Sequence, residues 1–346
     1  MRPQTRSSKW PTGTRGAQVE TKYRDLLRRF TPTPLVADLA VMGRTVRLET
    51  NSSSVSGVLA KIFEPYQGLT KAGPDFLWRI VAETNSGFIQ PWPDMTAFSD
   101  GCLHYVNLGH RSFLAVDFEA RTAIAFVPEA WVGEEAGFSS VFAATLFDLT
   151  APALQLVQVS CACVAQDGKA LLIFGPPRSG KSTSAYLAGK LGLEFHADEA
   201  TFLGPRGERW GAWGQFWPAA FREDTTRFLP ELVSSAGPFS YGSLTFLCFH
   251  QHPFRPSLTR PLAPVGCLFL QRQAATGPVL AALSASDAER RLQRGFPFRH
   301  EKRLEVQISA ALRALTALPA YELAYGSDPA EAAGVFRTLL ELEGKE

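Results

Sequence analysis

The chain has 346 residues, of which 45% are hydrophobic and 20% are charged. This length fits two domains, and the hydrophobic share, which includes 25 Phe and 7 Trp, is large enough for two cores. A wholly disordered chain is therefore excluded. The sequence has no apolar run of 18 residues and no apolar signal-peptide core. We expect a soluble, cytoplasmic protein without a membrane partner.

The net charge of +2 conceals a basic tail at the N-terminus. Residues 1–29 contain eight Lys and Arg but only two acidic residues. A nucleic-acid-binding protein would carry such a surplus on its folded body, interleaved with aromatic residues. Here the surplus lies in a stretch that contains Ser, Thr, Gly and Pro, which favours a solvated, mobile tail. We expect no nucleic-acid partner.

The five cysteines do not have the spacing of a metal site. They are an odd number and lie mostly in apolar runs, and Cys161 and Cys163 alternate along an extended segment without a second pair. We expect buried, reduced thiols.

The first half of the chain, residues 30–155, is predicted to be a small α+β domain with mostly antiparallel strands. Its expected elements are a hairpin at 36–49 around Gly43, a helix from Asn51 or Ser52 to about Phe63, strands at 76–81, 102–108, 112–117 and 122–127, and a helix at 139–149. No residue in this half has the pattern of a catalytic group. Docking or substrate selection is the role we expect for it.

The second half, residues 156–346, begins with a β-type run and continues as an α/β pattern. We expect a strand at 157–165, a turn at Asp167-Gly168, a strand at 170–174, a helix at 182–191 and a strand at 193–199. Residues 204–264 are rich in Gly, Pro, Trp and Arg and give no clear assignment. A strand at 265–271, a helix with Leu304, Ile308, Leu312 and Leu315 on one face, a strand at 321–325 and a helix from Asp328 complete the pattern.

The strongest motif lies between the strand at 170–174 and the helix at 182–191. Gly175-Pro176-Pro177-Arg178-Ser179-Gly180-Lys181-Ser182, followed by Thr183, has the spacing of a nucleotide phosphate-binding loop. Glycines let main-chain N–H groups approach phosphate oxygens, and the following helix directs its positive end at them. Lys181 would contact the β and γ phosphates, and the Ser182 hydroxyl would ligate Mg²⁺. A structural Gly/Pro turn is the alternative, but the position after a strand and before a helix favours a nucleotide. Arg178 would reach a phosphate or point to solvent.

An acidic pair, Asp198-Glu199, follows the next strand. Ligands lie at the carboxyl ends of parallel strands, so we expect both side chains to face the phosphate-binding loop. A kinase needs one carboxylate to accept the proton of the acceptor hydroxyl and another to hold the metal. The alternative is a solvated strand end. His196 would face the same side as Asp198, as a polar neighbour or as an ordinary strand histidine.

The loop, the short helix and the segment Phe195-His196-Ala197-Asp198-Glu199, preceded by the turn Asp167-Gly168-Lys169, resemble the HPr kinase/phosphorylase superfamily. Within the superfamily they more closely resemble the divergent kinase-like members near peptide-modification genes, and the resemblance covers about residues 155–345. The resemblance implies an α/β P-loop fold related to phosphoenolpyruvate carboxykinase, with ATP and Mg²⁺ as cofactors and a Ser or Thr hydroxyl as acceptor. It also implies that Asp198 is the general base and that Glu199 stands where the family has a second, metal-proximal Asp.

Besides Glu199, one further departure from the family bears on the activity. Many members have a His in the strand before the loop, where this chain has Ser160 or Cys161, so a plain kinase is expected rather than a phosphorylase. Arg222 is our candidate for stabilising charge on the transferred phosphate, although it could instead pair with an acidic neighbour such as Glu223. His250 and His252 lack a third metal ligand nearby and indicate a loop.

The sequence thus predicts a kinase that phosphorylates a hydroxyl of a peptide or protein. A nucleotide-binding switch with little turnover and a kinase of small molecules are the alternatives.

Overall fold

The computed structural model describes residues 31–66, 73–84, 95–109, 112–207, 209–241, 244–249, 260–273, 277–297 and 302–343. Its contacts group residues 33–346 into one unit and residues 1–32 into another. The predicted basic tail, together with His250 and His252, lies outside the described residues. The described chain is a mixed α/β protein, which agrees with the fold class predicted from the sequence.

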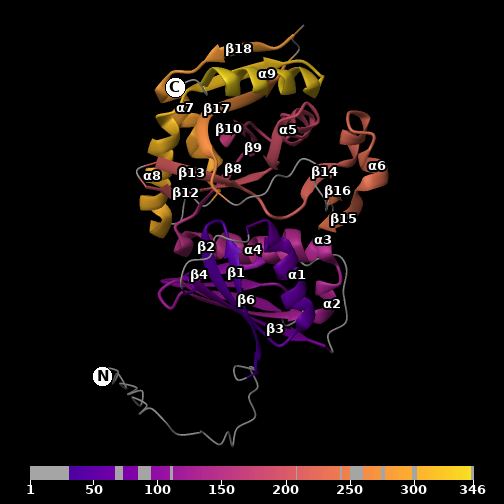
Figure 1. Cartoon of the computed structure of the whole chain (residues 1–346), viewed down its shortest axis with the longest axis vertical. Helices are drawn as coiled ribbons and strands as arrows, with labels where there is room; N and C mark the ends of the chain where they lie inside the picture. The colour runs from indigo at the N-terminus through magenta and orange to yellow at the C-terminus, as the bar shows by residue number, and fades with distance from the viewer. Residues whose placement is uncertain are drawn as a thin grey trace, which may run out of the picture. The chain divides into compact units, whose positions relative to one another are not determined.

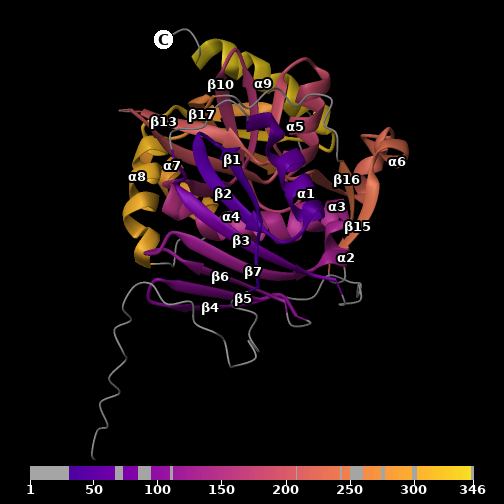
Figure 2. The same cartoon turned by 60° about the horizontal axis from the view of Figure 1, so that its bottom comes forward.

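The first sheet is formed within residues 35–128 and has the order β1-β2-β3-β7-β6-β5-β4. Its strands are β1 (Leu35–Val41), β2 (Arg44–Thr50), β3 (Phe76–Glu83), β4 (Thr96–Asp100), β5 (Leu103–Asn107), β6 (Phe113–Asp117) and β7 (Thr122–Pro128). β3 runs parallel to β2 and to β7, and the other neighbours are antiparallel. β4, β5 and β6 lie side by side at one end of the sheet (Figure 2). The predicted hairpin and the four predicted strands that follow it are confirmed, and β4 is an addition.

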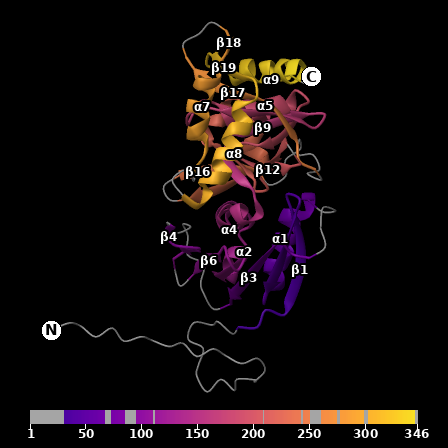
Figure 3. The same cartoon turned by 90° about the vertical axis from the view of Figure 1, so that its left-hand side faces the viewer.

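One face of this sheet is covered by helices. α1 (Ser53–Phe63) begins at Ser52, whose hydroxyl accepts a hydrogen bond from the Val55 N–H at 3.2 Å. It packs in the same core as α2 (Glu129–Val132) and α4 (Ala144–Thr150), so all three lie against one face (Figure 3). The opposite face leaves Phe98 and Ile124 exposed. The predicted helix at 51–63 is confirmed.

The predicted helix at 139–149 is longer and less regular than expected. It runs through α3 (Glu135–Gly137), a π-helical turn (Phe138–Ala143), α4 and a 3₁₀ turn (Ala151–Leu154). The helical segment Glu135–Leu154 is long and apolar enough to cross a membrane, but 67% of its most apolar window is buried inside the fold. Phe138, Phe142 and Phe147 are core residues, which accounts for the apolar composition.

The second sheet has the order β11-β9-β10-β17-β19-β18. Its strands are β9 (Ala162–Gln166), β10 (Lys169–Phe174), β11 (Glu194–Ala197), β17 (Ala263–Arg272), β18 (Val279–Ala282) and β19 (Ala320–Tyr325). Its helices are α5 (Lys181–Lys190), α7 (Ala285–Leu292), α8 (Glu305–Thr316) and α9 (Pro329–Glu343). α5 and α9 share one core with the sheet and α7 and α8 share the other, so the sheet lies between two helical layers (Figure 1).

The segment that the sequence left unassigned contributes strands to two short sheets. β12 (Ala200–Arg206) pairs with β8 (Val157–Ser160) and β13 (Arg209–Gly214), and β16 (Leu244–Phe249) pairs with β14 (Ala219–Arg222) and β15 (Gly237–Tyr241). A short helix, α6 (Leu232–Ser235), packs on β16. The single strand predicted at 157–165 is wrong, because the chain leaves one sheet at Ser160 and enters another at Ala162.

The boundary predicted at residue 155 is crossed by the hydrophobic core. The core of the first sheet also contains Ala200, Phe202, Trp213 and Phe216. In addition, the Tyr66 hydroxyl donates to the Gly214 carbonyl at 3.0 Å. The division into a docking domain and a catalytic domain stays a prediction.

Asp148 of α4 is expected to make the stability of the fold depend on pH. Its side chain is half-buried, but its Oδ1 atom is shielded from solvent. Burial, and then the negative charge of Glu199, raise its pKa well above the ordinary value, while a hydrogen bond with Gln158 opposes them. The folded-state pKa is thus above the unfolded one, so this group stabilises the fold at acid pH and the stabilisation is lost as pH rises. Asp148→Asn should therefore raise the melting temperature by a few degrees in mildly alkaline buffer and have little effect at acid pH.

Asp38→Asn is the matched control with the opposite sign. A hydrogen bond from Arg47 lowers the pKa of Asp38, so this carboxylate stabilises the fold at neutral pH and the stabilisation is lost in acid. The pair is exposed, so its contribution to stability should be small. Thermal unfolding across pH measures both variants. An unchanged melting temperature for Asp148→Asn in alkaline buffer would contradict the effect assigned to Asp148.

Candidate active site

The carboxyl ends of four strands meet at one edge of the second sheet. β10, β17 and β19 are parallel. β11 is antiparallel to β9, and β9 is antiparallel to β10, so β11 also runs in the direction of β10. The segments that follow β10 and β11 therefore emerge at the same edge. This topology brings the glycine-rich loop, residues 175–182, near Asp198 and Glu199.

The glycine-rich loop depends on two glycines for close packing as well as for its backbone shape. A side-chain carbon on Gly175 would lie 2.5 Å from the Ser179 Oγ and 2.8 Å from the Leu270 carbonyl oxygen. Gly180 has a φ of 91° and would collide with the Tyr325 hydroxyl. Both contacts are with the protein itself, so the need for glycine here does not by itself show a ligand.

Tyr325, at the end of β19, stabilises the conformation of the glycine-rich loop. Its hydroxyl donates a hydrogen bond to the Ser179 carbonyl. Burial raises the pKa of this phenol, so it keeps the proton that it donates. The loop conformation is therefore held by a strand on the β17 side of β10.

Lys181 is the first residue of α5 and lies inside the curve of the loop. Its Nζ donates to the carbonyl oxygens of Gly175 at 2.8 Å and Pro176 at 3.1 Å. Burial lowers the pKa of the ammonium, while the charges of Glu199 and Asp198 act against this. The helix begins at Lys181 rather than at Ser182 as predicted, because Gly180 is its N-cap. The Ser182 hydroxyl donates to the Asp198 carbonyl oxygen at 3.3 Å.

Asp198 is buried and held on both carboxylate oxygens. The Gln215 Nε2 donates to Oδ1 at 2.6 Å, and the Ala220 N–H donates to Oδ2 at 3.4 Å. The Gln215 Oε1 accepts from the N–H groups of Glu199 and Ala200, at 3.1 Å each. Gln215 therefore fixes both the carboxylate and the main chain that carries it. The strand ends at Ala197, so the prediction of a strand through Glu199 is wrong at its end.

The environment of Asp198 moves its pKa into the neutral range. Burial, followed by the negative charge of Glu199, raises the pKa to about 7, although the hydrogen bonds from Ala220 and Gln215 lower it. A carboxylate with a pKa near the ambient pH is well suited to accept a proton from a reacting hydroxyl. Glu199 differs, because its side chain is exposed at the same place.

We expect any transfer reaction that uses Asp198 as a base to rise with pH through about 7. The base must be unprotonated before the acceptor binds, so kcat/KM for the acceptor should follow the fraction of Asp198 that is ionised. A pH profile of kcat/KM at saturating nucleotide measures this rise. A flat profile between mildly acid and mildly alkaline pH would exclude Asp198 as the group that titrates.

A cavity of about 1340 Å³ contains every site residue predicted from the sequence. Its lining includes residues 175–183, Asp198, Glu199 and Arg222. The structure thus brings the predicted residues together, and their roles stay predictions. Ser182, Asp198 and Glu199 offer oxygen ligands, which suit Mg²⁺. In the described part of the chain no group of three or more His, Cys, Asp and Glu could hold a metal, so protein side chains alone do not form a metal cage there.

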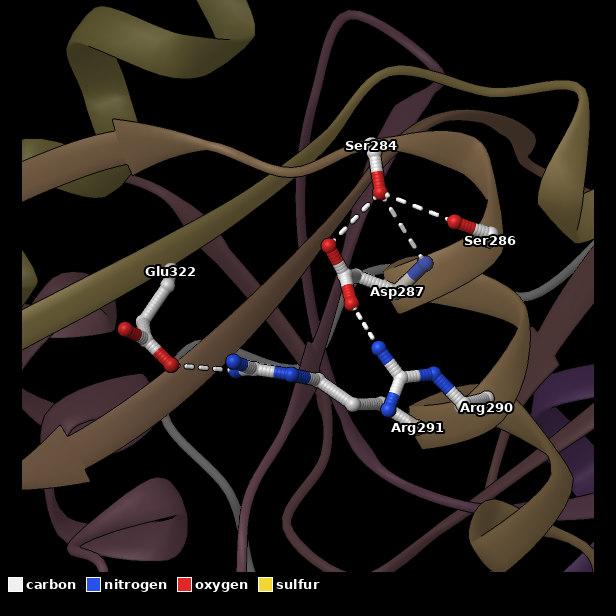
Figure 4. Close-up of polar contacts among 6 residues, drawn as sticks. All are labelled: Ser284, Ser286, Asp287, Arg290, Arg291 and Glu322. Atoms are coloured by element: carbon white, nitrogen blue, oxygen red, sulfur yellow. Dashed lines mark hydrogen bonds and ion pairs between the residues drawn. The ribbon is translucent and has the colours of Figure 1, made fainter.

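Sequence reasoning missed several charged residues of the cavity. They are Asp224, Arg227, Arg272, Arg291, Arg294 and Glu322. Arg272 ends β17, so the rule that ligands lie at carboxyl strand ends would have found it. Arg291 lies in α7, and Arg294 lies in the 3₁₀ turn that follows it. Figure 4 shows Arg291 paired with Glu322 while Arg290 pairs with Asp287.

Other predicted residues lie away from this cavity. His196 is buried, and its Nε2 lies 2.9 Å from a Glu194 carboxylate oxygen, so it is a strand histidine and not a member of the cavity lining. All five cysteines are free thiols. Four of them are buried as expected, and Cys102 is half-buried.

Comparisons with known proteins match this chain to solved structures and to no family model or curated protein. No family model matches the sequence, and no curated protein matches it. Among solved structures, the Hpr(Ser) kinase/phosphatase from Coxiella burnetii aligns with 54% of this chain and 95% of its own, with 9% sequence identity and a TM-score of 0.28. These values describe a distant structural neighbour and carry no inference about activity.

Proposed function

We propose that this protein is an ATP- and Mg²⁺-dependent kinase that transfers the γ-phosphoryl group to a hydroxyl. The observation that carries the proposal is the buried Asp198 carboxylate. It is held by Gln215, its pKa is about 7, and it lies in the same cavity as the glycine-rich loop. A passive nucleotide switch does not need a buried carboxylate tuned to accept a proton.

The loop and the start of α5 would bind the phosphates. Main-chain N–H groups of the loop and the positive end of the helix favour phosphate oxygens. Lys181 would exchange its bonds to the Gly175 and Pro176 carbonyls for bonds to the β and γ phosphates. Ser182 and Glu199, with Asp198 nearby, would hold Mg²⁺, which neutralises charge on the phosphates when bound.

The chemical step uses Asp198 as base. Asp198 accepts the proton of the acceptor hydroxyl, and the acceptor oxygen forms a bond to the γ-phosphorus. The bond between that phosphorus and the oxygen shared with the β-phosphate breaks, so ADP and a phosphate ester are the products. Arg222, exposed and lining the cavity, would stabilise the charge on the transferred group.

The strand order supports a proposal for which end of the cavity holds the nucleoside and which holds the acceptor. Asp198 follows β11, on the β9 side of the loop, whereas β17 and β19 lie on the other side. With the γ-phosphate facing Asp198, the nucleoside lies toward β17 and β19, where Phe269, Arg291 and Glu322 line the cavity. The Arg291 guanidinium lies 5.6 Å from the centre of the Phe269 ring. The acceptor then lies toward β14.

Calorimetry with ATP and Mg²⁺, beside a labelled-phosphate assay on Ser and Thr peptides and on small polyols, tests the proposal. We expect Mg²⁺-dependent ATP binding and transfer to a hydroxyl, with a peptide or protein hydroxyl preferred to that of a small molecule. Binding without transfer to any hydroxyl would favour the nucleotide switch. Absence of ATP binding would reject both.

A further inference from the structure

β14 forms one edge of its sheet beside Asp198. The sheet has the order β14-β16-β15, so no other described strand pairs with the outer side of β14. β14 is antiparallel to β16, with Ala220 opposite Cys248 and Arg222 opposite Phe246. Ala220, Phe221 and Arg222 all line the cavity that contains the glycine-rich loop. The free edge of β14 therefore faces the candidate active site.

The direction of the main-chain groups on this edge follows from one hydrogen bond. The Ala220 N–H donates to the Asp198 Oδ2 at 3.4 Å, so it points away from β16. Main-chain groups of alternate residues in an antiparallel strand point to the same side. The Ala220 carbonyl and the Arg222 N–H consequently also point away from β16. They form an acceptor and a donor, two residues apart, next to the carboxylate proposed as the base.

We propose that this edge binds the main chain of an extended acceptor peptide and places a Ser or Thr hydroxyl at Asp198. An added strand lies about 4.8 Å from its neighbour, which is a distance that a Ser or Thr side chain can bridge to a carboxylate at the strand edge. The inference rests on the proposed function and specifies its acceptor. One residue of the peptide would form hydrogen bonds with the Ala220 carbonyl and the Arg222 N–H. The preceding group on this edge, the Ala220 N–H, is already bound to Asp198.

Charge complementarity indicates the composition of the peptide. Arg222 and Arg227 are exposed and line the cavity at this end, with Asp224 between them. The Arg227 guanidinium lies 4.5 Å from the centre of the Phe228 ring, and Arg227 forms no ion pair with any residue that the structure describes. Asp198 and Glu199 also line this end, but the proposed function assigns them to the acceptor proton and to Mg²⁺, and it assigns Arg222 to the transferred phosphate. Arg227 is then the cation that favours an acidic side chain beside the hydroxyl residue.

Comparison of Arg222→Pro with Arg222→Ala isolates the main-chain contact. Both substitutions remove the guanidinium, but only proline removes the N–H. Arg222 has a φ of −75°, which proline adopts, and its N–H makes no bond to β16, so the fold should tolerate the change. We expect the KM for a short Ser peptide to be about 10-fold higher for the proline variant than for the alanine variant, the scale of one lost hydrogen bond. Equal KM values with equal melting temperatures would overturn the proposal.

Arg227→Gln tests the preference for an acidic peptide without altering the strand. Ser peptides that carry Glu, Gln or Lys beside the Ser are compared, and Arg313→Gln, an exposed arginine of α8, is the control. We expect the parent and the control to prefer the Glu peptide by about 10-fold or more in kcat/KM, and Arg227→Gln to lose most of that preference. No preference in the parent would overturn the charge argument. Transfer to polyols but to no peptide would overturn the inference and leave the kinase proposal intact.

Discussion

Asp198→Asn should lower the rate of phosphoryl transfer by roughly 10²- to 10⁴-fold while the protein still binds nucleotide. Asparagine has the shape of aspartate and its oxygen can still accept from Gln215, but it cannot take a proton from the acceptor. Its amide nitrogen would replace the oxygen that faces the Ala220 N–H, at 3.4 Å, so a weak contact is also lost. ATP affinity should be unchanged or higher, because one negative charge near the triphosphate is removed.

The melting temperature and the transfer rate of the Asn variant together separate the loss of a base from a disturbed fold. The ionised form of Asp198 is disfavoured by burial, so the folded-state pKa is raised and this group loses stabilising power as pH rises through about 7. The Asn variant should therefore melt no lower than the parent in alkaline buffer. Glu199→Gln should instead weaken Mg²⁺-dependent binding first. Equal transfer rates for the parent and Asp198→Asn would remove Asp198 from the mechanism.

Lys181→Ala is expected to abolish measurable transfer and to reduce ATP affinity by at least about 10-fold. The reason is that the phosphate-facing cation stabilises both the bound ATP and the transition state of transfer. The substitution also removes the bonds from Nζ to the Gly175 and Pro176 carbonyls, so the loop loses an internal support. The ammonium is itself disfavoured by burial. We therefore expect global stability to change little although the function is lost.

Lys190→Ala on the same helix is the matched control for Lys181→Ala. Lys190 pairs with Glu231 at 2.8 Å at an exposed position outside the cavity. Its loss should leave ATP affinity and transfer at parent values, because an exposed ion pair contributes little. Calorimetry and the labelled-phosphate assay read both variants. Transfer at the parent rate by Lys181→Ala would place the site elsewhere in the chain.

The parts of the site that could be predicted are those determined by local sequence. The turn Asp167-Gly168 connects two antiparallel strands and has a positive φ at both residues, as its sequence indicates. The strand, loop and helix around Gly175 and Lys181 follow from residues that are adjacent in the chain. The position of Asp198 near the loop follows from one helix and one strand between them.

The missed parts depend on contacts between distant segments. Gln215 has no motif, and its role appears only when β13 brings it next to Asp198, 17 residues away. The described residues between 204 and 249 contribute short strands to two small sheets, and the mixed burial of these strands gives no clear period in the sequence. Cys161 lies inside an apolar run, so nothing in that run shows that the chain changes sheets there.

The contact between Tyr325 and Ser179 has a consequence for the order in which the site is completed during synthesis. The two residues are 146 positions apart, and the loop also packs against β17 through Gly175. Chains emerge from the ribosome from the N-terminus onward, so the glycine-rich loop is exposed well before its support in β19 has been made. Nascent chains that end before residue 325 should therefore carry the complete motif without its final conformation. Nucleotide is expected to act as a ligand of the finished protein, and not as a template for its folding on the ribosome.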